Sequence, residues 1–218
     1  MNQRIVVAVD GPSGSGKSSV SRAIAREFGL AYLDTGAMYR ALAWWSIHGQ
    51  TDLSTCVLDV STSPDEARVV VNGRDVTEEI RGPEVTRAVS QVASDPAVRS
   101  LAVAQQRRLI AQADRGIVVE GRDITTVVAP DADVRIFLTA DLAARESRRA
   151  AEFADPATAA VMRETIAARD AIDATREHSP LALVDGVTQI DATHMTLAEV
   201  IDTVRTIVEQ AIGGSHDV

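Results

Sequence analysis

The sequence predicts an α/β fold in which a parallel five-stranded sheet carries helices on both faces. Five apolar runs of strand type alternate, for the most part, with stretches of helical composition, a pattern typical of a doubly wound sheet. A glycine-rich loop, residues 11–18, separates the first strand from the first helix. With 218 residues, 45% of them hydrophobic, the chain can form one domain around a sizeable core.

The strand candidates are short runs rich in apolar and β-branched residues, at 4–10, 31–34, 116–120, 134–138 and 187–191. Stretches of helical composition lie at about 19–28, 37–48, 83–94, 96–113, 141–153 and 156–175. Proline at positions 83 and 96 marks the first turn of two of these helices. Thr196 and Glu199 have the spacing of a capping box, which predicts the start of a final helix.

One segment, about 55–94, does not fit this alternation and reads as an insertion between the second and third core strands. Within it, two β-rich runs at 67–71 and 74–76 flank Asn72 and Gly73, which predicts a hairpin with a two-residue turn. We therefore expect a single domain over 1–218. Its core covers about 1–54 and 95–218, with an α+β insertion at about 55–94 and a helical lid at about 145–157.

The glycine-rich loop matches the full phosphate-binding pattern G-x-x-x-x-G-K-[ST] and predicts a P-loop fold. Its glycines can adopt positive φ, so that successive amides point at a phosphate chain beside the positive end of a helix. Lys17 would reach the β- and γ-phosphates of ATP, and the Ser18 hydroxyl would bind magnesium. The expected nucleotide-binding residues are Gly11, Pro12, Ser13, Gly14, Ser15, Gly16, Lys17, Ser18 and Ser19.

Bulk properties argue against several other classes of protein. A net charge of −9 argues against a nucleic-acid backbone as the main partner. Cys56 is the only cysteine, which excludes an internal disulfide and a cysteine-rich metal site. No apolar run is long enough to cross a membrane, and the first apolar run is a strand rather than a signal peptide. We expect a cytoplasmic protein without a membrane partner.

Polar residues follow the ends of several predicted strands and should converge on one cleft. They include Asp10, residues 34–36 and residues 120–123. Arg169, Asp173 and Arg176 have the spacing of one helix face, and so do Arg145, Arg148 and Arg149. Taken alone, each group could equally be a polar turn or a solvated helix face. Arginine nevertheless suits a phosphate site, because its planar fork binds phosphate oxygens bidentately.

Together these motifs resemble the bacterial cytidylate kinase family, which phosphorylates CMP and dCMP. The resemblance covers nearly the whole chain. It runs through the loop, residues 33–40 (LDTGAMYR), 90–93 (SQVA), 98–99 (VR), 120–123 (EGRD) and 169–176 (RDAIDATR). It implies that the insertion binds the monophosphate. It also implies that Arg40, Arg122 and Arg176 hold the acceptor phosphate, that Thr35, Arg99 and Asp123 meet the cytosine, and that Ser90, Arg169 and Asp173 lie near the pentose.

The chemistry of cytosine agrees with these roles. The Asp123 carboxylate can accept a hydrogen bond from the cytosine amino group, whereas the corresponding carbonyl of uracil would be repelled. Lys17, Arg122, Arg176 and the lid residue Arg148 would neutralise charge on the transferred phosphoryl group. Which lid arginine does so is open, and Asp10, Asp34 and Asp123 remain alternatives for a second carboxylate that directs magnesium.

The prediction is therefore a monomeric kinase that transfers the γ-phosphoryl group of ATP to CMP or dCMP, giving CDP or dCDP and ADP. One alternative is a kinase of the same architecture with another acceptor, such as UMP or a small metabolite. A second is a P-loop regulatory NTPase that binds a protein partner. A third is a nucleotide-binding module without turnover. Release of ADP that depends on an acceptor would separate the two kinase hypotheses from the NTPase and the binding module.

Overall fold

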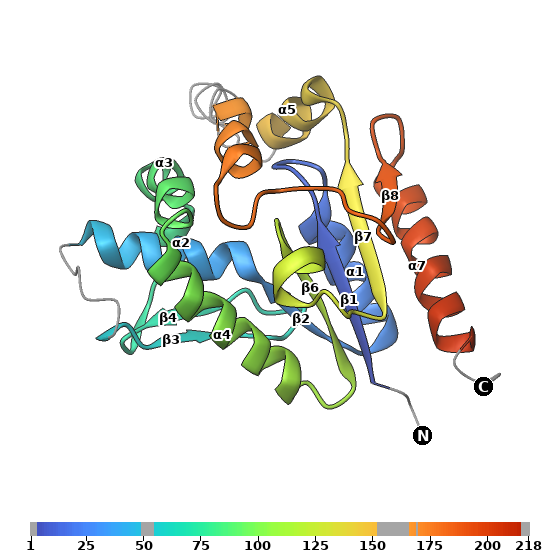
Figure 1. Ribbon diagram of the computed structural model, residues 1–218, viewed down its shortest axis with the longest axis horizontal. Coiled ribbons are helices and arrows are strands. Elements are labelled where there is room, and N and C mark those ends of the chain that lie inside the picture. Colours follow the sequence, from blue (N-terminus) through green and yellow to red (C-terminus); the bar gives the residue numbers. More distant parts are fainter. Residues whose placement is uncertain (1–3, 49–54, 152–165, 169, 215–218) are drawn as a thin grey trace.

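The structure is a computed structural model of the chain, and it describes residues 4–48, 55–151, 166–168 and 170–214 (Figure 1). Its main sheet has the strand order β2-β6-β1-β7-β8, and all neighbours are parallel. The strands are β1 (Ile5–Asp10), β2 (Ala31–Asp34), β6 (Gly116–Gly121), β7 (Val134–Thr139) and β8 (Thr188–Asp191). The predicted five-stranded parallel sheet is confirmed.

Both faces of this sheet are covered, because alternate residues of its strands enter two separate cores. Val6 and Ala8 of β1 pack on one face, toward α2 (Thr35–Ile47) and α4 (Pro96–Gln112). Val7 and Val9 pack on the other, toward α1 (Lys17–Phe28) and α7 (Leu197–Gly214). All six residues of β1 are buried, as expected for a central strand covered on both sides.

The segment between α2 and α4 forms a lobe beside the sheet, and its apolar residues belong to the same core as Val6 and Ala8 (Figure 1). It holds a three-stranded antiparallel sheet of β3 (Leu58–Val60), β4 (Val69–Val71) and β5 (Arg74–Asp75). The 3₁₀ turn η2 (Glu79–Arg81) and α3 (Pro83–Val92) complete it. Asn72 and Gly73 have φ values of 49° and 81°, so the predicted two-residue hairpin is present.

Three elements of the structure have no counterpart in the sequence prediction: β3, the short turn η2 and the π-helix η3. β3 is only three residues long and was missed because so short a strand carries too little periodicity to be recognised. The π-helix η3 (Ile124–Val128) directly follows β6 and is held by Asp10. A long-range contact of this kind leaves no periodic signal in the sequence.

The carboxyl ends of the main strands point toward α5 (Leu142–Ala151) and the helical residues 166–168 and 170–175 (Figure 1). The helix expected over 141–153 is present as α5, and its last two residues lie outside the described part. The same is true of residues 156–165 and 169 of the following predicted helix and of residues 152–157 of the predicted lid. Within the described part, no helix combines the length and apolarity needed to cross a membrane.

Candidate active site

The glycine-rich loop has the backbone geometry that its sequence predicts. Gly11, Gly14 and Gly16 have φ values of 152°, 74° and 97°. A Cβ atom on Gly11 would lie 2.0 Å from the Leu138 carbonyl oxygen, and one on Gly14 would lie 2.8 Å from the Arg145 carbonyl oxygen. Gly16 caps α1 without a side-chain hydrogen bond. The positive end of α1 is therefore directed at the space that the loop encloses.

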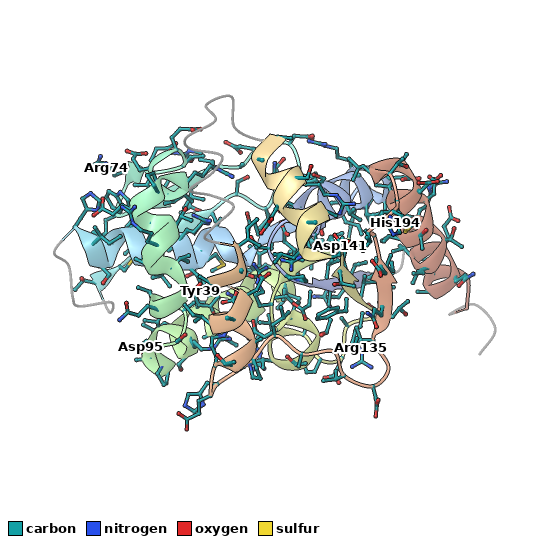
Figure 2. All side chains as sticks on the ribbon, turned by 90° about the horizontal axis from the view of Figure 1, so that it is seen from above. Tyr39, Arg74, Asp95, Arg135, Asp141 and His194 are labelled. Carbon is teal, nitrogen blue, oxygen red and sulfur yellow. The ribbon has the colours of Figure 1, made fainter. Side chains whose placement is uncertain are left out.

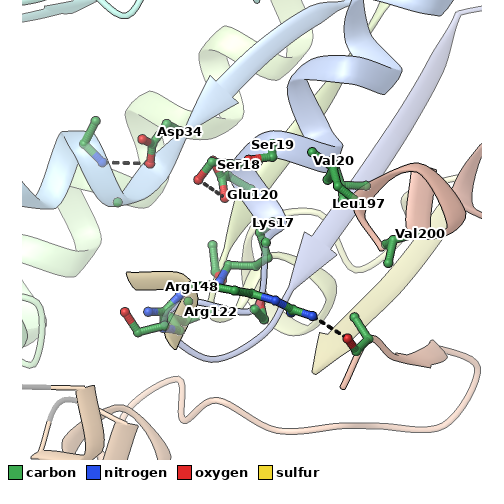
Figure 3. Close-up of a pocket in the computed structure, with 18 of the residues that line it drawn as sticks. Lys17, Ser18, Ser19, Val20, Asp34, Glu120, Arg122, Arg148, Leu197 and Val200 are labelled. Atoms are coloured by element: carbon green, nitrogen blue, oxygen red, sulfur yellow. Dashed lines mark hydrogen bonds between the residues drawn. The ribbon is translucent and has the colours of Figure 1, made fainter. Parts of the chain in front are cut away.

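A cleft of about 660 Å³ opens beside this loop (Figure 3). Loop residues 13–19 line it, together with Asp34, Arg40, Glu120, Arg122 and Arg148. Figure 3 shows Lys17, Arg122 and Arg148 gathered in one part of the cleft, with Val20, Leu197 and Val200 at another. Residues from three strand ends thus meet in one place, as expected, and the cleft has both a cationic part and an apolar part.

Lys17 is buried at the centre of this arrangement, and its ammonium group donates a 2.8 Å hydrogen bond to the Pro12 carbonyl. Burial and, after it, the nearby charge of Arg122 lower the pKa of Lys17 to about 7, although the charge of Glu120 acts in the opposite direction. A desolvated cation close to a second cation is poised to gain stabilisation from an anionic ligand.

Glu120, the last but one residue of β6, is a site residue that the sequence analysis did not assign. Its Oε2 accepts a 3.0 Å hydrogen bond from Ser18 Oγ, and its Oε1 accepts one from the Tyr32 hydroxyl. Burial and the charge of Asp34 raise the pKa of Glu120, and Lys17 partly offsets this rise. The EGRD pattern offered a signal, since this carboxylate lies at the carboxyl end of a strand, as Asp10 and Asp34 do.

The structure separates the three carboxylates considered as magnesium-directing groups. Asp10 is fully buried and accepts hydrogen bonds from the Ile124 and Thr125 amides and from the Thr125 hydroxyl. Asp34 lines the cleft and caps α2 by accepting from the Ala37 amide at 2.9 Å. Asp123 is paired with Arg99 away from the cleft lining. Glu120 is the carboxylate that contacts Ser18.

Five of the six residues assigned to the acceptor base and sugar are described, and they form a buried cluster beside the cleft: Thr35, Ser90, Arg99, Asp123 and Asp173. Arg99 pairs with Asp123, and the Arg99 guanidinium also donates to the Ala93 carbonyl at 3.1 Å. Burial raises the pKa of Asp123, and Arg99 opposes that rise. The Thr35 hydroxyl donates to the Glu120 carbonyl at 2.7 Å, while the buried Ser90 hydroxyl has no hydrogen-bond partner among the described residues.

Arg122 joins this cluster to the loop. Its Nη1 donates to the Gly11 carbonyl and its Nε to Asp173 Oδ2, both at 2.9 Å. Arg176 Nη1 lies 4.0 Å from Asp173 Oδ1, and burial lowers the pKa of Arg176. Arg40, which lines the cleft, donates to the Ile80 carbonyl and the Thr86 hydroxyl. Of the three arginines predicted to hold the acceptor phosphate, Arg40 and Arg122 line the cleft, and Arg176 is linked to Arg122 through Asp173. Arg169, predicted to lie near the pentose, is outside the described residues.

Arg145 and Arg148 of α5 have different surroundings. Arg145 is buried, pairs with Asp170 and donates to the Ser13 carbonyl at 3.1 Å, and Asp170 accepts from the Ser13 amide at 3.0 Å. Arg148 lines the cleft and donates to the Ala192 carbonyl at 2.5 Å. Of the two, Arg148 faces the space into which a nucleotide could bind.

The apolar part of the cleft was also missed by the sequence analysis. It is lined by Val20, Ala192, Met195, Leu197 and Val200, of which the last four follow β8 or begin α7. Leu197 is 51% exposed. An exposed leucine at the start of a helix has no distinguishing signal in the sequence. Leu197 is recognised as part of the site only because the start of α7 lies beside the glycine-rich loop in the fold.

A family model described as cytidylate kinase matches residues 7–210. A cytidylate kinase from Streptomyces griseus subsp. griseus is 46% identical, over 94% of this chain and 93% of that protein. A cytidylate kinase from Rhodococcus jostii (strain RHA1) is 45% identical over 98% of both chains. A bifunctional pantoate ligase/cytidylate kinase from Synechococcus sp. (strain WH7803) is 45% identical, and the match covers 95% of this chain and 45% of that protein.

Solved structures give the same fold at low sequence identity. A gluconokinase from Sinorhizobium meliloti 1021 superposes with a TM-score of 0.54 at 16% identity and covers 98% of both chains. A protein from Eubacterium ventriosum superposes with a TM-score of 0.53 at 14% identity, covering 94% of this chain and 99% of that one. At these identities the likeness concerns the fold alone.

Proposed function

The chain belongs to the cytidylate kinase family, and on that premise we propose that it transfers the γ-phosphoryl group of ATP to CMP or dCMP. The products are CDP or dCDP and ADP. The observation that carries this proposal is the position of Arg122, which contacts both the phosphate loop at Gly11 and the acceptor cluster at Asp173. A donor site and an arginine-rich acceptor site therefore meet at one side chain, as a transfer between two phosphates requires.

In this proposal the loop binds the triphosphate of ATP. The amides of residues 13–18 and the positive end of α1 face the phosphates, and Lys17 exchanges its bond to the Pro12 carbonyl for phosphate oxygens. The adenine base lies against the apolar part of the cleft, between Val20 and the residues Met195, Leu197 and Val200. Arg148 lies beside this path and supplies a lid cation to the transferred group.

Magnesium would be held through Ser18 and, from the second side, Glu120. Hydroxyl and carboxylate oxygens are the donors that this ion prefers, and the two side chains already contact each other at 3.0 Å. When bound, magnesium neutralises charge that develops on the phosphate oxygens. Tyr32 fixes the other oxygen of Glu120 and so keeps this carboxylate turned toward Ser18.

The acceptor phosphate would be bound by Arg40, Arg122 and Arg176 at the opposite end of the cleft. No general base is needed, because an acceptor phosphate oxygen is already ionised at neutral pH. The catalytic work of the protein is positioning and charge neutralisation. Arg145 and Asp170 tie the region around α5 to Ser13, which supports a role for this region in excluding water from the loop.

A monomeric state and a cytoplasmic location accompany this function as proposals. The single cysteine supports the cytoplasmic location. The net charge of −9 supports the absence of a nucleic-acid partner. The acceptor-binding role of residues 55–94 is likewise a proposal, supported by Ile80 and Arg81, which line the cleft from that lobe.

Asp123→Asn is expected to reduce the preference for CMP over UMP by about tenfold or more, because the carboxylate that accepts from the cytosine amino group is replaced by an amide. The substitution also leaves Arg99 buried without its counter-charge, so a lower melting temperature should accompany it. The measurement is kcat/KM for both acceptors. Asp65→Asn, which alters an exposed carboxylate, is the control. An unchanged preference would remove Asp123 from base recognition.

The function itself is tested by ADP release with ATP, magnesium and each of CMP, dCMP, UMP, AMP and GMP. We expect turnover with CMP and dCMP and its loss when EDTA removes the metal. A comparable rate with UMP would leave the fold and phosphate chemistry in place and overturn the account of base selection. Release that does not depend on an acceptor would indicate an NTPase instead.

A further inference from the structure

The interface of α2 and α4 contains buried polar groups that the proposed reaction does not use. Among the described residues, the Tyr39 hydroxyl and both amide atoms of Gln106 have no hydrogen-bond partner. Gln106 is 0% exposed and Tyr39 is 7% exposed. Buried polar groups are nearly always paired in folded proteins, so two neighbouring exceptions call for an explanation.

Gln106 lies in the same part of the molecule as the base-reading pair. It follows Arg99 by seven residues in α4, which places both side chains on one face of the helix, two turns apart. The Arg99 guanidinium carbon lies 5.5 Å from the centre of the Tyr39 ring, and Arg99 pairs with Asp123. In Figure 2, Tyr39 lies toward the middle of the molecule, whereas Arg74 and His194 lie near its ends.

Gln106 and Tyr39 face each other without completing a bond. Burial raises the pKa of Tyr39, and Gln106 is close enough to its hydroxyl to lower that pKa. The two groups nevertheless do not meet in hydrogen-bonding geometry. A movement of the Tyr39 ring that completed this bond would also move the ring face over which the Arg99 guanidinium lies.

We propose that Gln106 is a positioning residue for the acceptor base. Its amide binds the Tyr39 hydroxyl when the acceptor enters, fixes the Tyr39 ring beneath Arg99, and so holds Arg99 and Asp123 in register with the base. This inference rests on the proposed function, because it needs Arg99 and Asp123 to recognise the acceptor. It adds to that function two residues, Gln106 and Tyr39, that do not contact the nucleotide but influence which acceptor base the enzyme selects.

An amide without a role in acceptor binding predicts a different result. Replacing a buried, unpartnered amide by an apolar side chain of similar size is then neutral or stabilising, and acceptor binding does not change. If Gln106 positions the base site, stability likewise stays constant or rises, but the affinity for CMP falls.

The adjacent Gln105 provides a matched control within the same helix. Its amide donates a 2.6 Å hydrogen bond to the Leu58 carbonyl of β3 and not to Tyr39 or the base-reading pair. We expect Gln106→Met to raise KM for CMP about tenfold, to lower the CMP to UMP ratio of kcat/KM, and to leave kcat and the melting temperature nearly unchanged. Gln105→Met should lower the melting temperature and leave KM and the ratio unchanged.

Tyr39→Phe keeps the ring and removes the hydroxyl, so it should reproduce the rise in KM independently of how well Gln106→Met folds. The double variant should match either single variant, because both remove the same interaction. A wild-type KM and acceptor ratio in Tyr39→Phe or in folded Gln106→Met, or additive effects in the double variant, would overturn the inference alone. Wild-type protein that fails to phosphorylate CMP would overturn the proposed function and the inference with it.

Discussion

Arg122→Ala is expected to lower kcat with CMP by about 100-fold to 1,000-fold while the protein stays folded. Arg122 is the side chain shared by the two halves of the cleft, since its guanidinium reaches the Gly11 carbonyl and the Asp173 carboxylate from one position. During transfer it would neutralise charge on oxygens of both the donor and the acceptor. Alanine removes that charge, and no other described arginine could replace it, because none contacts both Gly11 and Asp173.

Steady-state ADP release with CMP tests this expectation, with circular dichroism to confirm folding. Arg122→Lys should recover part of the rate, because lysine restores the charge but not the fork that binds two groups at once. Arg26→Ala is the matched control, since Arg26 forms an exposed ion pair with Asp65 and such pairs contribute little. Near-normal kinetics in a folded Arg122→Ala protein would exclude the role assigned to this residue.

Lys17→Met should lower kcat by about 1,000-fold or more, and Lys17→Arg should be nearly as damaging. Lys17 is the only lysine in the sequence, and the other 21 basic residues are arginine. All basic positions except 17 therefore carry arginine. Position 17, where the glycine-rich loop surrounds the side chain, carries the compact ammonium group of lysine. Lys17 is buried at 7% exposure, so the wider, planar guanidinium of arginine would have to displace atoms that pack around the ammonium group.

This uniqueness also makes Lys17 directly observable. An amine-specific acylating reagent can modify only Lys17 and the chain's N-terminal amine, and peptide mass spectrometry separates the two sites. ATP with magnesium is expected to protect Lys17 and leave labelling of the terminal amine unchanged. Equal labelling of Lys17 with and without ATP, or a Lys17→Arg variant with wild-type turnover, would contradict the assigned role.

Local signals were sufficient for most of the fold. The five parallel strands, the Asn72-Gly73 hairpin and the capping box at Thr196 were all predicted, and the structure contains each of them. Each of these features depends on residues within a few positions of one another, through periodicity, turn chemistry or a cap. β3 was missed because three residues carry too little periodicity, and its partner β4 lies about ten residues further along.

The sequence by itself determined the chemistry of the donor site, because the P-loop is a continuous segment whose backbone conformation follows from its own glycines. The family resemblance of the sequence also singled out Arg40, Arg122 and Arg176 as a group, and their role in binding the acceptor phosphate stays a prediction. Only the tertiary structure decided which carboxylate faces Ser18, because Asp10, Asp34 and Glu120 all end a strand and differ only in their neighbours. The Asp10 carboxylate accepts hydrogen bonds from backbone amides of η3 and is therefore already paired. The Glu120 carboxylate accepts from Tyr32, on the adjacent strand, through one oxygen and from Ser18 through the other. The tertiary structure likewise brought Gln106 to Tyr39 and the apolar residues of α7 to the loop, since contacts between segments so far apart depend on packing that no local pattern encodes.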